Sequence, residues 1–293
     1  MKFRALIYII LASLLWGTSA IFFKLLTPFG YAPIQLTAMR GIVSAVSIIL
    51  YALITNRKLF KAGKKELLLF ISSGISVFLT AFFYYASIAH SSVSTAAMLM
   101  YTAPVFVTAY SVSFLGEKLT RSKVIAIVMV VVGCALVSGI AGGVECSFLG
   151  FALGLSSGIM YSTYNIIARI AMMNKSNSLS ATLYCFSTMG VISLFAGDIG
   201  GIVRIAQTDI AATLPLIIGI GIFTCVLPYF LYTLALRNIP AGTASAIGIL
   251  EPIAATIFSM AFFGEILTVS GFLGIVLVLS AVFILSRTKE DNK

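Results

Sequence analysis

The feature of this sequence that most constrains its fold is a series of ten long apolar runs. A helix that crosses a bilayer needs about 20 mainly apolar residues. Several connections between runs, such as His90-Ser91 and Ile239-Pro240, are so short that neighbouring runs must form antiparallel helical hairpins. The runs lie near residues 3–26, 33–55, 67–89, 92–115, 122–140, 147–170, 179–199, 211–236, 241–263 and 269–286.

The composition supports a membrane protein. Hydrophobic residues make up 60% of the chain, charged residues make up 10%, and the mean hydropathy is +1.10. We therefore expect an all-α, multi-pass protein of the cytoplasmic (plasma) membrane with ten transmembrane helices. Its partners would be the lipid bilayer and a small-molecule substrate. The sequence leaves the oligomeric state open, a monomer included.

The basic residues predict the orientation of the chain. The net charge of +10 is carried by short segments between the apolar runs, so we expect no nucleic-acid partner. Placing the N-terminus in the cytoplasm puts 16 of the 19 Lys and Arg residues on that side. Only Lys24 and Arg204 fall outside, and Arg40 lies within a helix. This bias predicts that both termini are cytoplasmic.

The chain contains an internal duplication. Aligned without a gap, residues 104–122 and 252–270 match at nine of nineteen positions, including Pro104/Pro252 and a Gly-Glu pair. The Gly-Glu pairs are Gly116-Glu117 and Gly264-Glu265. A duplicated helical unit with a proline in the middle of a span is typical of transporter halves.

The duplication predicts two inverted repeats. Each copy holds five spans, an odd number, so the second copy must enter the membrane from the opposite face. The first repeat then covers residues 1–140, the second covers 147–286, and 287–293 form a cytoplasmic tail. Glu117 and Glu265 would lie at opposite faces. An offset of 145 also pairs Lys24 with Arg169, which suggests that the first and sixth spans are equivalent.

Glu251 is the most informative polar residue, because it lies near the middle of the ninth run and directly before Pro252. An ionisable group at that depth costs about 2.5–3.5 kcal/mol, so it should face a cavity or a partner. The proline also frees a backbone carbonyl one turn earlier. Glu251 either binds substrate or a proton, or is a structural carboxylate bonded to a neighbouring helix.

The first repeat carries different polar groups at this level. Ala103 is the counterpart of Glu251, and Tyr101 and Thr102 supply the nearby polar atoms. If both proline-containing helices line one cavity, Tyr101 and Glu251 would form opposing walls of it.

Arg40 lies within the second run, nearer its predicted outer end. Its side chain can snorkel to the interface or form an internal salt bridge. The alternative is a role in binding a carboxylate or in gating, and charge coupling would then involve Arg40 and Glu251.

The sixth run carries small and polar residues at helical spacing. Gly150, Gly154 and Gly158 recur every fourth residue, which predicts close helix packing. Ser157, Tyr161 and Asn165 recur at the same spacing on a neighbouring face, which should point inward. Cavity lining and helix packing are equally good interpretations of Asn165.

Aromatic residues supply further candidates. Trp16 lies too deep for an interfacial belt and is interpreted as a cavity wall. Tyr84 and Tyr232 are repeat counterparts that line an apolar pocket or anchor helix ends at the interface. The candidate gating or hinge positions are Pro104, Gly116, Pro228, Pro252 and Gly264.

Sequence patterns of catalysis are absent. There is no GxSxG, no Walker-type phosphate loop and no HExxH, and the four cysteines lack CxxC or CxxH spacing. We therefore predict neither an enzyme nor a cofactor or metal site. Without an ATP site, a driving force must come from a substrate or ion gradient.

These motifs together resemble the drug/metabolite transporter superfamily, and more narrowly the EamA family of ten-helix bacterial carriers. The resemblance rests on Trp16-Gly17, Arg40, Pro104, the Leu250–Pro252 stretch, and the FLGEKLT and FFGEILT copies. It covers nearly the whole chain. It implies two inverted five-helix repeats, alternating access, and a cavity lined mainly by spans 1, 3, 4, 6, 8 and 9.

The resulting functional hypothesis is a secondary active or facilitative transporter that exports a small metabolite such as an amino acid. Members of the family carry chemically unrelated solutes, so the resemblance does not identify the substrate. The alternatives are a lipid-linked substrate flippase, and a non-transporting membrane receptor or assembly factor.

Overall fold

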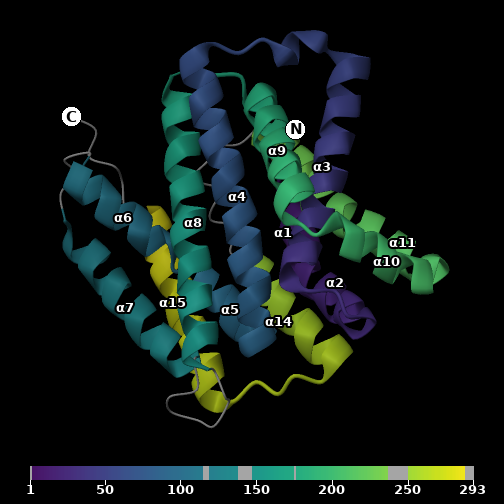
Figure 1. Cartoon of the computed structure of the whole chain (residues 1–293). Coiled ribbons are helices and arrows are strands. Elements are labelled where there is room, and N and C mark those ends of the chain that lie inside the picture. The colour runs from purple at the N-terminus through teal and green to yellow at the C-terminus, as the bar shows by residue number, and fades with distance from the viewer. Residues whose placement is uncertain (1, 115–118, 138–146, 175, 237–249, 288–293) are drawn as a thin grey trace.

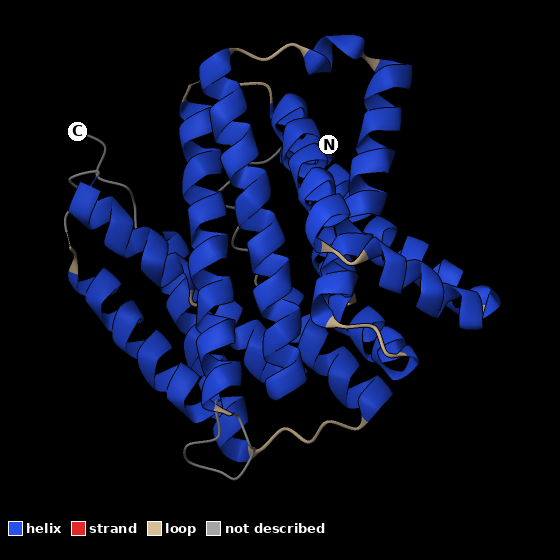
Figure 2. Cartoon of the chain, viewed as in Figure 1, coloured by secondary structure: helices blue, strands red, loops and turns tan. Residues whose placement is uncertain are grey.

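The computed structural model describes residues 2–114, 119–137, 147–174, 176–236 and 250–287. Within these ranges every regular element is a helix (Figure 2). The all-α fold predicted from the apolar runs is therefore confirmed. The long unbroken helices are α3 (Pro33–Thr55), α4 (Lys64–His90), α7 (Arg121–Val137), α8 (Phe148–Met173), α9 (Ser178–Ala196) and α15 (Val269–Arg287).

The remaining helices are shorter pieces of the predicted runs. In several cases two or three of these elements cover one predicted run, and they are separated by a break or by a change of helix type. They are α1 (Lys2–Gly17), α2 (Ser19–Leu26), α5 (Val93–Met100), α6 (Ala103–Phe114), α11 (Ile210–Gly221), the π-helix η3 (Ile222–Val226), α12 (Leu227–Leu236) and α14 (Leu250–Phe263). The connecting elements are η1 (Thr27–Phe29), η2 (Arg57–Phe60) and α10 (Ile199–Thr208).

Length and hydropathy agree with a membrane location. Among the described residues, five segments are long and apolar enough to cross a bilayer, and three shorter apolar helices accompany them. The five are Phe3–Phe29, Pro33–Thr55, Lys64–His90, Ser178–Ala196 and Ile210–Tyr232. The shorter ones are Thr95–Val107, Ile253–Phe263 and Val269–Ala281.

Several helix starts follow from local sequence. Pro33 opens α3, where its missing N–H would be unpaired anyway, and the Gln35 side chain accepts a hydrogen bond from the Ala32 N–H at 2.9 Å. Asn177 caps α9 by accepting from the N–H groups of the second and third helical residues. These caps fix where the long spans begin.

Three predicted runs are not continuous helices. The first run breaks at Thr18, between α1 and α2, and the fourth breaks at Tyr101 and Thr102, just before Pro104. The eighth run widens into the π-helix η3, which ends two residues before Pro228. Proline lacks an N–H and disfavours a helical conformation in the residue before it, so the helix is weakest near Pro104 and Pro228. The break at Thr18 has no proline nearby.

Helix packing follows the sequence repeat. Helix α3 packs on α9, and α7 packs on α15, so equivalent spans of the two halves meet each other (Figure 1). Helix α4 packs on α8, and α12 packs on α1. Exchanging each span for its repeat counterpart converts the α4/α8 pair into the α12/α1 pair. The bundle therefore has the approximate twofold symmetry of a duplicated fold.

The two repeats run in opposite directions along the bundle. Helix α1 descends from the N-terminus toward α2, whereas α8 ascends toward α9 in the same view (Figure 1). The start of α8 lies beside the end of α4, where the Ser147 hydroxyl donates to the His90 carbonyl at 3.1 Å. The cytoplasmic location of the termini stays a prediction.

Candidate functional site

The candidate site is built around a hydrogen bond between Tyr101 and Glu251. The Tyr101 hydroxyl donates to Oε2 of Glu251 at 2.6 Å, across 150 residues of sequence. Tyr101 lies in the break between α5 and α6, and Glu251 is the second residue of α14. The two side chains expected to form opposing walls are thus in direct contact. Their bond links the two halves of the chain beside the repeated prolines.

Aromatic rings of α8 extend from this bond. The ring of Tyr101 packs edge-on against Tyr161, with the centroids 6.4 Å apart, and Tyr161 stacks on Tyr164 at 6.3 Å. Tyr161 also interacts electrostatically with both Glu251 and Tyr232. It therefore lies between the Glu251 carboxylate and the next group of aromatic residues.

That next group joins α1, α9 and α12. Trp16 packs against Tyr229 and Tyr232, with ring centroids 5.2 and 5.6 Å apart. Phe186 contacts the ring of Tyr229 edge-on at 4.9 Å. We call these seven residues the aromatic cluster: Trp16, Tyr101, Tyr161, Tyr164, Phe186, Tyr229 and Tyr232.

Arg40 points into the protein rather than toward the membrane interface, so the snorkelling interpretation is wrong. Its Nη2 donates to the carbonyl of Thr224 at 3.0 Å, and its Nε donates to Sγ of Cys225 at 2.7 Å. An α-helix would supply the Thr224 carbonyl with the N–H of residue 228, but that residue is Pro228. Arg40 is also close enough for its charge to act on Glu251. The guanidinium therefore holds the π-helix from within the bundle.

Three of the predicted residues, Trp16, Tyr84 and Tyr232, lie against other aromatic side chains. Trp16 and Tyr232 contact each other inside the aromatic cluster, with both side chains half-buried. Tyr84 is 6% exposed and packs on Tyr85, so it lies in the protein core rather than at a lipid-facing helix end. The alternative of Tyr84 as an interfacial anchor is wrong for this reason. Tyr84 also interacts electrostatically with Glu251.

Two other candidates, Ser157 and Thr102, bond to backbone carbonyls, and a third, Asn165, has no such contact among the described residues. The buried Ser157 hydroxyl donates to the Thr80 carbonyl of α4 at 3.0 Å, and the Thr102 hydroxyl donates to the Leu99 carbonyl at 2.7 Å. Both hydroxyls thereby satisfy backbone groups. Asn165 is half-buried one turn beyond Tyr161, and no contact within the described part of the chain ties it to the aromatic cluster.

The candidate hinge residues have different surroundings. Pro104 lies in the first turn of α6 and Pro252 in the first turn of α14, each at the start of a described helix. Pro228 is buried at the start of α12, next to the π-helix. Gly264 has a φ of +63°, a left-handed conformation that ends α14. Gly116 lies outside the described residues.

Some contacts of the site were missed from the sequence. Tyr164 and Phe186 belong to the aromatic cluster, and the backbone of Thr224 is the partner of Arg40. Pro228 could have indicated the Thr224 contact, because a proline has no N–H to donate to the carbonyl four residues before it. Tyr164 and Phe186 have no distinguishing sequence pattern in so aromatic a chain.

The groups at the site can recognise a small ligand. The site offers one carboxylate, several phenol groups and apolar ring faces, with one guanidinium nearby. No group of three potential metal-binding side chains occurs among the described residues. A largely apolar wall with a few polar groups is the usual composition of a small-ligand site.

Comparison with known proteins agrees with this arrangement. The model of the EamA-like transporter family matches residues 3–139 and 148–287. The uncharacterized transporter YwfM of Bacillus subtilis is 24% identical, over 98% of this chain and 95% of its own length. An uncharacterized transporter of Archaeoglobus fulgidus is also 24% identical, over 95% of each chain.

A solved crystal structure shares the fold. It superposes with a TM-score of 0.61 at 16% sequence identity, covering 96% of this chain and 95% of that one. The family match spans both halves of the chain, and the helix packing repeats between those halves. This chain therefore belongs to the EamA-like transporter family and is a multi-pass transporter of the plasma membrane.

Proposed function

We propose that the protein exports a small zwitterionic or partly apolar metabolite, such as an amino acid, by alternating access. The observation that carries this proposal is the Tyr101–Glu251 hydrogen bond inside the aromatic cluster. The Glu251 carboxylate can accept hydrogen bonds from a substrate amino group. Ring faces can hold apolar parts of the substrate or attract its positive charge.

The proposed motion is a rocking of the two repeats, residues 1–140 and 147–286, about a site that both of them build. The helix break at Tyr101 and Thr102 and the π-helix before Pro228 supply positions where a span can bend without losing a regular hydrogen-bond ladder. The shared prolines support the same role for α6 and α14. Inverted repeats of this kind support access from either face.

Proton coupling through Glu251 is part of the proposal. The carboxylate lies among neutral phenols, and its one described hydrogen-bond donor is the Tyr101 hydroxyl. Protonation of Glu251 would remove a buried charge and weaken its attraction for a substrate cation. A proton gradient could then drive release of substrate on one side.

A flux assay in proteoliposomes tests this proposal. The purified protein is reconstituted and supplied with radiolabelled amino acids and other small metabolites, with and without a pH gradient. We expect uptake of at least one solute that is stimulated by the gradient and abolished by an uncoupler. In Glu251→Gln the response to the gradient should be lost.

A matched variant controls for the loss of a carboxylate. Glu66→Gln changes a partly exposed glutamate at the start of α4 that accepts a hydrogen bond from the Gly63 N–H, a bond that a glutamine oxygen can replace. It should transport like the wild type. Absence of flux for every solute, together with movement of a labelled lipid-linked sugar, would instead favour a flippase. Uptake that ignores pH and uncouplers would contradict proton coupling.

A further inference from the structure

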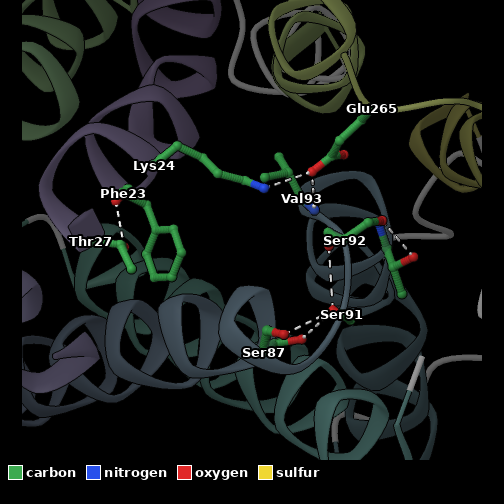
Figure 3. A network of polar contacts seen from close by, with 9 residues as sticks. Phe23, Lys24, Thr27, Ser87, Ser91, Ser92, Val93 and Glu265 are labelled. Atoms are coloured by element: carbon green, nitrogen blue, oxygen red, sulfur yellow. Dashed lines mark hydrogen bonds and ion pairs between the residues drawn. The ribbon is translucent and has the colours of Figure 1, made fainter. Parts of the chain in front are cut away.

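An ion pair lies at one end of the bundle, away from the aromatic cluster. Lys24 of α2 and Glu265, just beyond α14, meet with Nζ and Oε1 3.4 Å apart (Figure 3). The ammonium group also lies over the ring of Phe263, 5.8 Å from its centroid. Among the described residues this is the one salt bridge. It does not belong to the site proposed for the substrate.

The same carboxylate also binds the start of α5. Oε1 of Glu265 accepts a hydrogen bond from the Val93 N–H at 3.3 Å, and the Ser92 side chain accepts from the Thr95 N–H at 3.0 Å. The first N–H groups of a helix have no partner within the helix and attract negative charge. Glu265 is thus a cap contributed from a distant part of the chain, as Figure 3 shows.

The Gly-Glu motif accounts for the position of this carboxylate. Gly264 ends α14 in a left-handed conformation, and the Glu265 N–H turns back to the Ser259 carbonyl at 3.5 Å. A glycine adopts this conformation without strain, and the following residue is then directed away from the helix axis. The motif therefore aims Glu265 at α2 and α5.

The contact joins the two halves of the chain at this end. Lys24 and Val93 belong to the first half, whereas Glu265 belongs to the second. Lys24 is also one of two basic residues that depart from the predicted cytoplasmic bias, and Glu265 provides it with a counter-charge. Any motion that separates the halves at this end must break both the ion pair and the cap.

The contact between Lys24 and Glu265 is weak enough to be reversible. The side chains of Lys24 and Glu265 are 35% and 17% exposed, so water weakens their attraction. Oε2 of Glu265 is buried and has no hydrogen-bond partner in the described part of the chain. A carboxylate with one oxygen unpaired is incompletely compensated for its desolvation. Breaking this one contact should therefore cost little free energy.

We propose that Lys24, Glu265 and the α5 N-terminus at Val93 form a latch, and that its opening is a step of the transport cycle. The latch holds α2 and α5 of the first half against the end of α14. Its release lets this end of the bundle open, and the opposite end closes as the halves rock. This inference rests on the alternating access proposed above.

Hydrogen exchange of the full-length protein in lipid nanodiscs tests the latch without a substrate. In Lys24→Gln, amides of residues 19–26 and 93–96 should exchange about fivefold faster, the size expected when a partly exposed ion pair is lost. Amides near Ala5 and Ile9, which pack with Ala235 at the other end, should exchange more slowly. Opposite changes at the two ends are the signature of a latch.

Three further variants make the test specific. Lys24→Arg keeps the charge and should behave like the wild type. Arg204→Gln removes the other basic residue predicted on the same face and should change neither end. Glu265→Gln removes the ion pair while keeping an acceptor for Val93, so it should reproduce the effect of Lys24→Gln. Faster exchange at both ends, or no change at either end, would overturn the proposal.

The flux assay separates failure of the latch from failure of the transport proposal. If a transported solute is found, Lys24→Gln should alter its flux while Lys24→Arg leaves it unchanged. Wild-type flux and wild-type exchange in Lys24→Gln would reject the latch and leave the transporter assignment intact. Opposite exchange changes with no transported solute would support the latch and count against the proposed substrate class.

Discussion

At the scale of single residues, the central feature is an asymmetry inside a symmetric fold. The repeated prolines Pro104 and Pro252 are shared, but Glu251 corresponds to Ala103. Symmetry alone would give both halves the same polar group. The chain instead places a phenol, Tyr101, opposite the carboxylate, which allows one direct hydrogen bond and avoids repulsion between two buried acids.

Removing the Tyr101 hydroxyl tests this pairing. In Tyr101→Phe the carboxylate loses its described donor, and a hydrogen bond to a charged group contributes about 1.5–3 kcal/mol. Initial transport rates should therefore fall by roughly tenfold or more. The control is Tyr51→Phe, which removes a hydroxyl but can keep the ring contact between residue 51 and Phe230. Equal transport by both variants would contradict a role for the Tyr101–Glu251 bond.

Arg40 shows how a proline in one helix leaves a backbone carbonyl that a side chain of another helix binds. Pro228 cannot donate to the Thr224 carbonyl, and the guanidinium of Arg40 takes the place of that N–H. The positive charge is thereby held inside the bundle, where it can act on Glu251. A basic residue within a span indicates this kind of partner, but the sequence does not identify which carbonyl it binds.

At the scale of elements, the glycines of α8 explain how the broken fourth span is held. A Cβ added at Gly154 would lie 2.6 Å from Cδ1 of Leu99, and one added at Gly158 would lie 2.7 Å from the Thr102 hydroxyl. The backbone of α8 therefore touches α5 and the break at Tyr101 directly. The predicted packing role of these glycines is confirmed.

A methyl group at Gly158 should damage this contact. Its Cβ would also lie 2.9 Å from the Leu99 carbonyl, a backbone atom that cannot move aside easily. We expect Gly158→Ala to lose about 1–3 kcal/mol of stability, seen as a lower melting temperature in detergent. Gly200→Ala in α10 is the matched control, because nothing lies within 4 Å of its added Cβ. Equal melting temperatures for the two variants would contradict the packing argument.

At the scale of the whole molecule, the repeat organises both the packing and the ends of the bundle. The α4/α8 and α12/α1 pairs correspond through the repeat, and α3/α9 and α7/α15 pair equivalent spans. The connection between α3 and α4 carries Arg57, Lys58 and Lys61, whereas Lys24 and Glu265 meet at the far end of these helices. The positive-inside rule predicts that the former end lies in the cytoplasm.

Epitope insertion tests this orientation. A short tag inserted after Ala62, in the connection before α4, should bind antibody only after cells are permeabilised. A tag inserted after Thr208, between α10 and α11, should be detected on intact cells. Each tagged protein is checked for wild-type expression and melting temperature. Detection of the Ala62 tag on intact cells would reverse the orientation, and with it the face on which the latch lies.

Most of the fold could be predicted from the sequence because membrane spans obey a strong local rule. Each span must satisfy its own backbone hydrogen bonds in lipid, so an apolar run of sufficient length predicts a helix. The expected run at 33–55 and the observed α3 have the same bounds. The prediction of one continuous helix at 92–115 was wrong, because the helix breaks at Tyr101 and Thr102.

The sequence by itself determined the helices, the duplication and the residues that a membrane makes costly. Glu251 and Arg40 could be singled out because a charge within a membrane span has a free-energy cost that depends on the residue itself. The Gly-Glu motif could be singled out because glycine is a local signal for the end of a helix. Only the tertiary structure decided their partners: Tyr101 for Glu251, Thr224 for Arg40, and Lys24 with Val93 for Glu265. These contacts join residues far apart in the chain. They depend on how the two halves pack, which no local rule specifies.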